Sequence, residues 1–305
     1  MSTGNRTPTR LSLDGLSIGD AFGQKFFTHP EIVAGLIEER AVPSGPWSYT
    51  DDTEMALSIV SVLEEYGRVD QDALAVCFAE SYDSTRGYGS AMHQALARVR
   101  TGEPWSSVSR SLFGGEGSLG NGAAMRVAPL GAFFADDLDA VVREASRSAE
   151  VTHAHPEAVA GAIAVAVTAA WSTRLRGETP SMKIADLIDL VIPHVPEGLV
   201  REGLLKARRI DRSELSPAVA RVLGNGENVT AQDTVPFVIW SAAKHLDDFV
   251  EGMWQTVSGL GDRDTTCAMV GGIIGPFVGE EGLPADWIDR REPLPLPVSS
   301  SRTLE

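Results

Sequence analysis

Two short acidic segments in distant parts of the chain carry the residues best suited to chemistry. The first is Thr50-Asp-Asp-Thr53 and the second is Asp262-Arg-Asp-Thr265. Each stands directly before an apolar run that predicts a helix, over residues 55–66 and 267–278. Carboxylate and hydroxyl oxygens are the ligands that hard divalent cations prefer. If the two helix starts meet in the fold, one or two Mg²⁺ or Mn²⁺ ions could be held by Thr50, Asp51, Asp52, Asp262, Asp264 and Thr265.

Helix capping is the alternative interpretation of both segments. Asp and Thr are preferred N-caps, and acidic residues in a first turn stabilise the positive end of the helix dipole. Asp51 and Glu54 even have the spacing of a capping box. A cap uses only one side chain, whereas each of these helix starts carries a second carboxylate. The duplication favours a metal, but the spacing leaves both interpretations open.

A glycine-rich segment is a candidate anion site. It reads Gly114-Gly-Glu-Gly-Ser-Leu-Gly-Asn-Gly122 and precedes Ala123-Ala-Met-Arg126. Small residues let backbone N–H groups approach an anion closely, and a following helix start adds its positive dipole end. No Gly-Lys-Ser/Thr follows, so the segment is not the phosphate loop of an ATPase. A plain connection between two helices is the other interpretation.

Two histidines, His153 and His155, precede an Ala-rich predicted helix over residues 155–175. A closed zinc site needs more Cys or His ligands than this region holds. We therefore expect a turn that leads into the helix, with one His either structural or reaching a ligand. Both Cys77 and Cys267 lie in apolar helical patterns, which predicts buried free thiols and no disulfide.

Helical periodicity dominates the rest of the chain. Residues 53–66 place apolar side chains at i, i+3 and i+4 before Gly67, and Asp70 and Asp136 are predicted caps of later helices. Further helices are predicted over residues 89–99, 155–175, 183–191, 197–208, 230–244 and 264–278. Strand-like alternation is scarce. We predict one all-α domain over residues 10–292, with a flexible N-terminus over residues 1–9 and an extended Pro/Ser-rich tail over residues 293–305.

Composition limits the classes of partner. The chain has 305 residues, of which 43% are hydrophobic and 22% charged, so it can bury a sizeable core. A net charge of -16 argues against binding to nucleic acid or an anionic membrane and suits a protein that gathers cations. The longest apolar stretch, residues 158–171, is too short to span a bilayer, and residues 1–9 lack the apolar core of a signal peptide. We expect a cytoplasmic monomer.

The first acidic segment also fits another all-α class. Asp51-Asp-Thr-Glu54 matches the Asp-Asp-x-x-Asp/Glu motif of terpene synthases, which bind Mg²⁺-diphosphate. Those enzymes carry an Asn/Asp-Ser-Glu motif late in the chain. Here the late segment is Asp-x-Asp-Thr, which weakens this alternative.

Five segments together resemble the ADP-ribosylglycohydrolase family, which includes the dinitrogenase-reductase-activating glycohydrolases. In chain order they are Gly15-Leu-Ser-Ile-Gly-Asp-Ala-Phe-Gly23, Trp47-Ser-Tyr-Thr-Asp-Asp-Thr53, Gly120-Asn-Gly-Ala-Ala-Met-Arg-Val-Ala-Pro129, Thr152-His153 and Gly261-Asp-Arg-Asp-Thr265. The resemblance implies a compact orthogonal helical bundle with a dinuclear Mg²⁺ or Mn²⁺ centre. Thr50, Asp51 and Asp52 would supply one side of that centre, and Asp262, Asp264 and Thr265 the other. ADP-ribose would be bound by Gly117, Ser118, Gly120, Asn121, Gly122, Met125 and His153, with the loop amides facing its diphosphate.

The activity that this resemblance implies is hydrolysis of the glycosidic bond at C1″ of an ADP-ribosylated protein or small molecule, which releases ADP-ribose. Asp52 or Asp264 would accept the proton of the attacking water. Many members carry a Glu near the metals, four residues after the last glycine of Gly-Asp-Ala-x-Gly. That position is Phe27 here, and Glu31 lies further on, so the role of the Glu is not carried over. A non-catalytic ADP-ribose-binding module is therefore the alternative hypothesis.

Overall fold

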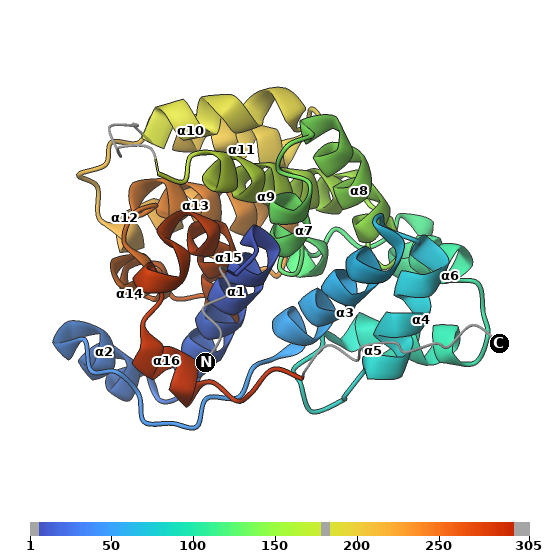
Figure 1. Cartoon of the computed structure of the whole chain (residues 1–305), viewed down its shortest axis with the longest axis horizontal. Helices are drawn as coiled ribbons and strands as arrows, with labels where there is room; N and C mark the ends of the chain where they lie inside the picture. Colours follow the sequence, from blue (N-terminus) through green and yellow to red (C-terminus); the bar gives the residue numbers. More distant parts are fainter. Residues whose placement is uncertain (1–5, 178–183, 296–305) are drawn as a thin grey trace.

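All regular structure in the described part of the chain, residues 6–177 and 184–295 of this computed structural model, is helical (Figure 1). The only strand-like pairings in those ranges are two isolated bridges, Trp47 with Arg291 and Gly120 with Thr230. The prediction of an all-α fold is confirmed. The α-helices are α1 (Pro8–Gln24), α2 (Pro30–Glu39), α3 (Asp51–Tyr66), α4 (Gln71–Ser81), α5 (Ser90–Arg100), α6 (Trp105–Ser111), α7 (Ala128–Phe133), α8 (Leu138–Glu150), α9 (Pro156–Arg174), α10 (Ile184–Val191), α11 (Leu199–Ala207), α12 (Ser216–Leu223), α13 (Ala231–Lys244), α14 (Phe249–Val257), α15 (Arg263–Gly282) and α16 (Ala285–Arg290). Short 3-10 turns are η1 (Leu112–Gly115), η2 (Asn121–Ala123) and η3 (Ile192–His194).

The predicted helices are present, with shifted ends. Helix α3 ends before Gly67, whose φ of 64° is left-handed, as expected for a C-terminal glycine. The predicted cap Asp136 is wrong by one residue: Asp137 is the cap, and its side chain accepts a hydrogen bond from the backbone N–H of Ala140 at 3.0 Å. Helix α1 begins at Pro8, so ordered structure starts inside the segment predicted as a flexible N-terminus. The predictions for residues 1–5, Lys183 and residues 296–305 lie outside the described residues.

Helices α1 and α15 lie side by side at the centre of the molecule and form its most extensive helix–helix contact among the described elements (Figure 1). They run antiparallel, because Gly15 faces Gly271 while Gly23 faces Arg263. A methyl group on Gly19 would lie 2.1 Å from the carbonyl oxygen of Cys267, closer than any side chain tolerates. The absence of side chains at these positions therefore lets the two backbones touch. This contact brings the end of α1 to the start of α15, where the second acidic segment lies.

A cluster of buried aromatic rings holds the chain that leads into α3. Phe22 of α1 stacks on Trp287 of α16, with ring centroids 4.5 Å apart, and Trp47 packs edge-on against Trp287. The backbone N–H of Trp47 donates to the carbonyl of Arg290 at 2.7 Å. Since Trp47 is only three residues before Thr50, these contacts place the first acidic segment beside α1.

Helix α9 occupies the interior and contacts α7, α8, α13 and α15. Within residues 158–171, the longest apolar stretch, every residue except Val159 and Trp171 is buried, as predicted. Cys267 is a buried free thiol as expected, whereas Cys77 is only half-buried, so that part of the prediction is wrong. Within the described ranges, no helix has the length and apolar character needed to cross a membrane.

Candidate metal centre and anion-binding loop

The two acidic segments, at the starts of α3 and α15, meet at the end of α1. The charges of Asp20, Asp264, Asp51 and Asp262 all act on the carboxyl of Asp52. Three helices far apart in sequence therefore contribute to one cluster of five carboxyl groups, which we call the acidic cluster: Asp20, Asp51, Asp52, Asp262 and Asp264.

Acidic residues lie in the first turns of α3 and α15, as the capping interpretation expected, but the predicted side-chain capping is wrong for both segments. Thr50 and Asp262 occupy the N-cap positions of α3 and α15, yet neither uses its side chain to cap its own helix. The start of α3 is instead capped from another helix. Asp20 of α1 accepts hydrogen bonds from the backbone N–H groups of Thr50 at 2.9 Å and Thr53 at 3.2 Å. The side chains at these two N-cap positions are thus not used to cap α3 and α15.

Asp20 is the residue of the acidic cluster that the sequence did not lead us to select. It is fully buried, and its carboxyl also accepts from the hydroxyl of Thr53 at 2.5 Å. A signal was present, because Asp20 is an acidic residue in an otherwise small and apolar segment, and a buried carboxylate needs partners. Its role is structural: it ties α1 to the first turn of α3.

Burial is the largest cause of the raised pKa values throughout the acidic cluster. It raises the pKa of Asp20 to about 6 and, with the charge of Asp20, that of Asp51 to about 7. Burial and repulsion from the other carboxylates raise the pKa of Asp52 and Asp264 well above the ordinary value, and burial raises that of Asp262. Carboxyl groups gathered in this way must share protons or bind a cation.

The hydroxyl group of Thr50 also indicates that the carboxyl groups share a proton or bind a cation. Its Oγ1 lies 2.9 Å from both Asp20 Oδ1 and Asp52 Oδ2. One hydroxyl hydrogen can serve only one of these acceptors, so the other bond requires a proton on a carboxyl group. With a cation bound, that proton would no longer be needed.

The donor set of the acidic cluster fits a divalent cation. Asp52 Oδ1 is buried and has no hydrogen-bond partner in the part of the chain that the structure describes. A buried oxygen without a partner is costly unless a ligand satisfies it. Thr50 and Thr265 add two buried hydroxyl groups. Across residues 6–177 and 184–295, no three His, Cys, Asp or Glu side chains already stand in ligating positions. The carboxyl groups are close together, but their present hydrogen bonds occupy some of the oxygens that a metal would use.

The glycine-rich loop, residues 117–122, lies against the acidic cluster. The side-chain amide of Asn121 donates to Asp262 Oδ2 at 2.7 Å and to the hydroxyl of Thr234 at 3.2 Å. The side-chain amide of Asn121 is therefore hydrogen-bonded to the acidic cluster. The sequence analysis assigned Asn121 to ADP-ribose binding alone and did not predict this contact. The contact joins the predicted anion site to the predicted metal site.

Several backbone N–H groups of this loop already donate hydrogen bonds to other protein atoms. Gly117 donates to the carbonyl of Leu112, Gly120 to the hydroxyl of Ser118, and Asn121 to the carbonyl of Val229. In the described part of the chain, the backbone N–H groups of Ser118 and Leu119 have no such bond. In the same ranges the backbone N–H of Gly122 also has no such bond, so these three amides remain for an anion and the predicted cradle is narrower than the whole loop. Met125 is buried beneath it.

His153 and His155, the two histidines considered as candidate site residues, have different structural roles. His155 is the N-cap of α9, and its Nδ1 accepts from the backbone N–H of Glu157 at 3.1 Å, as expected for a turn that leads into a helix. His153 is only 5% exposed, and its ring supports the glycine-rich loop from beneath. A methyl group on Gly122 would lie 2.9 Å from its Nε2. Contact between His153 and a ligand stays a prediction.

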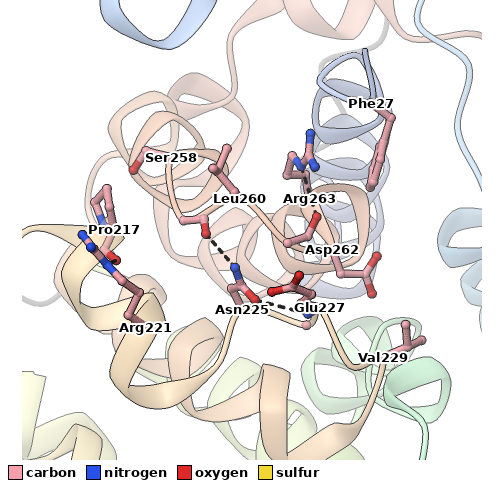
Figure 2. A pocket seen from close by; sticks show the side chains of 13 residues that line it. Phe27, Pro217, Arg221, Asn225, Glu227, Val229, Ser258, Leu260, Asp262 and Arg263 are labelled. Atoms are coloured by element: carbon pink, nitrogen blue, oxygen red, sulfur yellow. Dashed lines mark hydrogen bonds between the residues drawn. The ribbon is translucent and has the colours of Figure 1, made fainter. Parts of the chain in front are cut away.

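A cleft of about 680 Å³ opens beside Asp262 (Figure 2). Phe27 stands on its rim and is 48% exposed, and the guanidinium of Arg263 lies 4.5 Å from the centre of its ring. The ring cannot replace a carboxylate, so the cleft has an aromatic wall at the position where the resemblance led us to look for an acid. Glu31 lies in the first turn of α2 and is exposed, and it does not line this cleft.

Known proteins are similar to this chain over most of its length. The sequence profile described as ADP-ribosylglycohydrolase matches residues 6–301. The chain is 31% identical to ADP-ribosylhydrolase ARH3 of Xenopus tropicalis, an alignment that covers 91% of this chain and 89% of the relative. It is 32% identical to ADP-ribosylhydrolase ARH3 of Gallus gallus, covering 79% and 72%. A solved structure, the ADP-ribosylglycohydrolase-related protein complex, superposes with a TM-score of 0.63 at 26% identity and covers 93% of this chain and 92% of that one.

Proposed function

This chain belongs to the ADP-ribosylglycohydrolase family, and on that premise we propose that it is a metal-dependent hydrolase of ADP-ribosyl adducts. It would cleave the glycosidic bond at C1″ of the distal ribose and release ADP-ribose from a modified acceptor. The observation that carries this proposal is the acidic cluster beside the glycine-rich loop. A module that only held ADP-ribose would need the loop, but it would not need five gathered carboxyl groups.

Two Mg²⁺ or Mn²⁺ ions are the proposed cofactors, with Thr50, Asp51, Asp52, Asp262, Asp264 and Thr265 as the residues that would hold them. When bound, such ions supply Lewis acidity that orients ribose hydroxyl groups and lowers the pKa of a nearby water. Asp20 acts from the side, because its carboxyl holds Thr50 and Thr53 in place.

The protein's own groups have separate tasks in the proposed reaction. The N–H groups of Ser118 and Leu119 bind the diphosphate, which fixes the distal ribose over the acidic cluster. Asp52 or Asp264 accepts the proton of the attacking water, and the unpaired Oδ1 makes Asp52 the better-placed group. The remaining carboxylates stabilise the positive charge that develops at C1″ as the bond to the acceptor breaks. No covalent intermediate is required.

Metal binding should strengthen as the pH rises. Raised carboxyl pKa values mean that the folded, metal-free protein binds more protons than the unfolded chain between about pH 4 and pH 7. The charged carboxylates thus cost stability above that range, and bound cations remove this cost. We expect the increase in Tm caused by Mg²⁺ to grow by ~5 °C or more from about pH 5 to about pH 8, measured by scanning fluorimetry with chelator as reference. An increase that is constant or falls with pH contradicts a metal at this cluster.

Phe27 should affect the acceptor side of the reaction and not the metals. Replacement of Phe27 by Ala removes the exposed ring and its contact with Arg263, an interaction that contributes about 1 kcal/mol at an exposed site. We expect kcat/KM for an ADP-ribosylated peptide to change by less than ~10-fold, while the stabilisation by Mg²⁺ is unchanged. Loss of that stabilisation would show that the ring supports the acidic cluster directly.

A panel of defined substrates tests the proposed function. The protein is incubated with ADP-ribosylated serine peptide, arginine peptide and nucleic acid, each with Mg²⁺, Mn²⁺ or chelator, and released ADP-ribose is quantified by chromatography. Turnover of at least one substrate that chelator abolishes supports the hydrolase. Saturable binding of ADP-ribose without turnover of any substrate would instead identify a binding module.

A further inference from the structure

Arg126 is a buried cation to which no carboxylate of the described residues is bonded. Its Nη2 donates to the carbonyl of Ser148 at 3.0 Å and to the hydroxyl oxygen of Thr152 at 2.8 Å, and its guanidinium lies 4.5 Å from the ring centre of Phe78. A buried charge held mainly by neutral groups is unusual, because unpaired charges are expensive to desolvate. Its position therefore calls for an explanation beyond packing.

Thr152 links this cation to His153. The hydroxyl oxygen of Thr152 lies 2.7 Å from His153 Nδ1. Arginine can only donate, so it occupies a lone pair of that oxygen and leaves the hydroxyl hydrogen free to point elsewhere. Among the hydrogen bonds of the described residues, His153 Nδ1 is the single acceptor available to that hydrogen. A buried hydroxyl hydrogen without an acceptor is costly, which favours an unprotonated Nδ1 and a neutral ring that carries its hydrogen on Nε2.

The other ring nitrogen points to the glycine-rich loop. A methyl group on Gly122 would lie 2.9 Å from Nε2, too close to be accommodated without a shift, and one on Gly120 would make a tight contact at 3.3 Å. Burial and the charge of Arg126 lower the pKa of His153 to about 3, which keeps the ring neutral at physiological pH. No protein acceptor for Nε2 is found in the described part of the chain, and Nε2 is not among its buried, unpaired atoms. It is therefore open to a ligand at the edge of the loop.

We propose that Arg126 and Thr152 are positioning residues that fix His153 as a permanent Nε2–H donor toward ADP-ribose bound on the glycine-rich loop. The contact of His153 with ADP-ribose, the ligand half of this inference, rests on the proposed function. The fixed protonation of the ring on Nε2, the tautomer half, does not. The chain of contacts runs from Arg126 through Thr152 to His153 and sets the direction of every hydrogen bond in it. Without it, the ring could present a lone pair to an anionic ligand, which would repel it.

The variant Thr152→Val tests this relay, because it keeps the shape of the side chain and removes the hydroxyl. Nitrogen-15 NMR of the histidine rings, with His153 assigned from a His153→Gln variant, reports the tautomer without any ligand. We expect the wild-type ring to be protonated on Nε2 only and the Thr152→Val ring to populate both tautomers. Titration calorimetry should show ADP-ribose binding about tenfold weaker in Thr152→Val, the effect of one misdirected hydrogen bond.

Two further variants separate positioning from packing. Thr152→Ser restores the hydroxyl and should restore both the tautomer and the affinity. Thr168→Val removes another fully buried hydroxyl, which bonds only within α9, and should change neither. A wild-type ring protonated on Nδ1, or Thr152→Val with wild-type tautomer and affinity, overturns the relay. Wild-type protein that fails to bind ADP-ribose overturns the ligand half and the proposed function together, while the NMR result still decides the tautomer.

Discussion

Replacing Asp52 with asparagine should lower the rate of ADP-ribose release by at least ~1000-fold, since it removes both a proposed metal ligand and the best-placed proton acceptor. The fold should survive, because asparagine has nearly the same shape. The metal-free variant should melt no lower than the metal-free wild type, since the substitution removes one of five mutually repelling groups. Loss of activity without loss of stability distinguishes a functional carboxylate from a structural one. The measurements are single-substrate kinetics with Mg²⁺ and scanning fluorimetry with chelator.

Asp139 provides a matched control for this experiment. It is also an aspartate in the first turn of a helix, α8, but it is exposed and far from the acidic cluster in sequence. Asp139→Asn should retain wild-type activity, so a general effect of first-turn charge on the helix would be visible there. If Asp52→Asn kept more than about a tenth of the wild-type rate, a role for Asp52 as base or metal ligand would be excluded.

Replacing Gly19 with alanine should destabilise the protein by ~3 kcal/mol or more, because the new methyl group would meet backbone and not a side chain that can move. It would lie 2.1 Å from the carbonyl oxygen of Cys267, so α1 and α15 must separate. Since α1 carries Asp20 and α15 carries Asp264, this separation should also abolish the stabilisation by Mg²⁺. Urea unfolding with and without Mg²⁺ measures both effects.

Gly35 is the corresponding control. It is also a helical glycine, but a methyl group added to it would have no atom of the described residues within 4 Å apart from the backbone of its own helix. Gly35→Ala in α2 should stabilise the protein by about 0.5–1 kcal/mol through helix propensity alone. Equal stabilities of Gly19→Ala and wild type would show that the contact between α1 and α15 is looser than described. In that case the helix pair would not be what positions the acidic cluster.

Helix α1 shows what sequence pattern could not reveal. Periodicity identified α3 and α8 because each has one apolar face that is buried and one polar face that is exposed. From Leu11 to Gly23, α1 is buried on every side, so its polar residues do not mark a face that is exposed to solvent. Its glycines also lower helix propensity, although here they permit the close contact with α15.

The acidic cluster could be predicted in part. Two carboxylates at each helix start exceed what capping needs, and that surplus was readable from spacing. The partners of Asp20 were not readable, because Thr50 and Thr53 lie on a separate helix. The burial of His153 and the commitment of Asn121 to Asp262 likewise depend on tertiary packing. Local pattern thus revealed the proposed ligands but not the residues that orient them.

The cap that Asp20 supplies to α3 has a consequence for how this centre could arise. The first turn of α3 lacks a cap of its own and receives one from α1. A synthetic peptide spanning α3 alone, or the acidic segment grafted onto another scaffold, would carry the same aspartates and still coordinate ions poorly. Affinity for the cation therefore requires the folded protein. The helices α1 and α3 are synthesised early and α15 late, and they meet only in the tertiary structure.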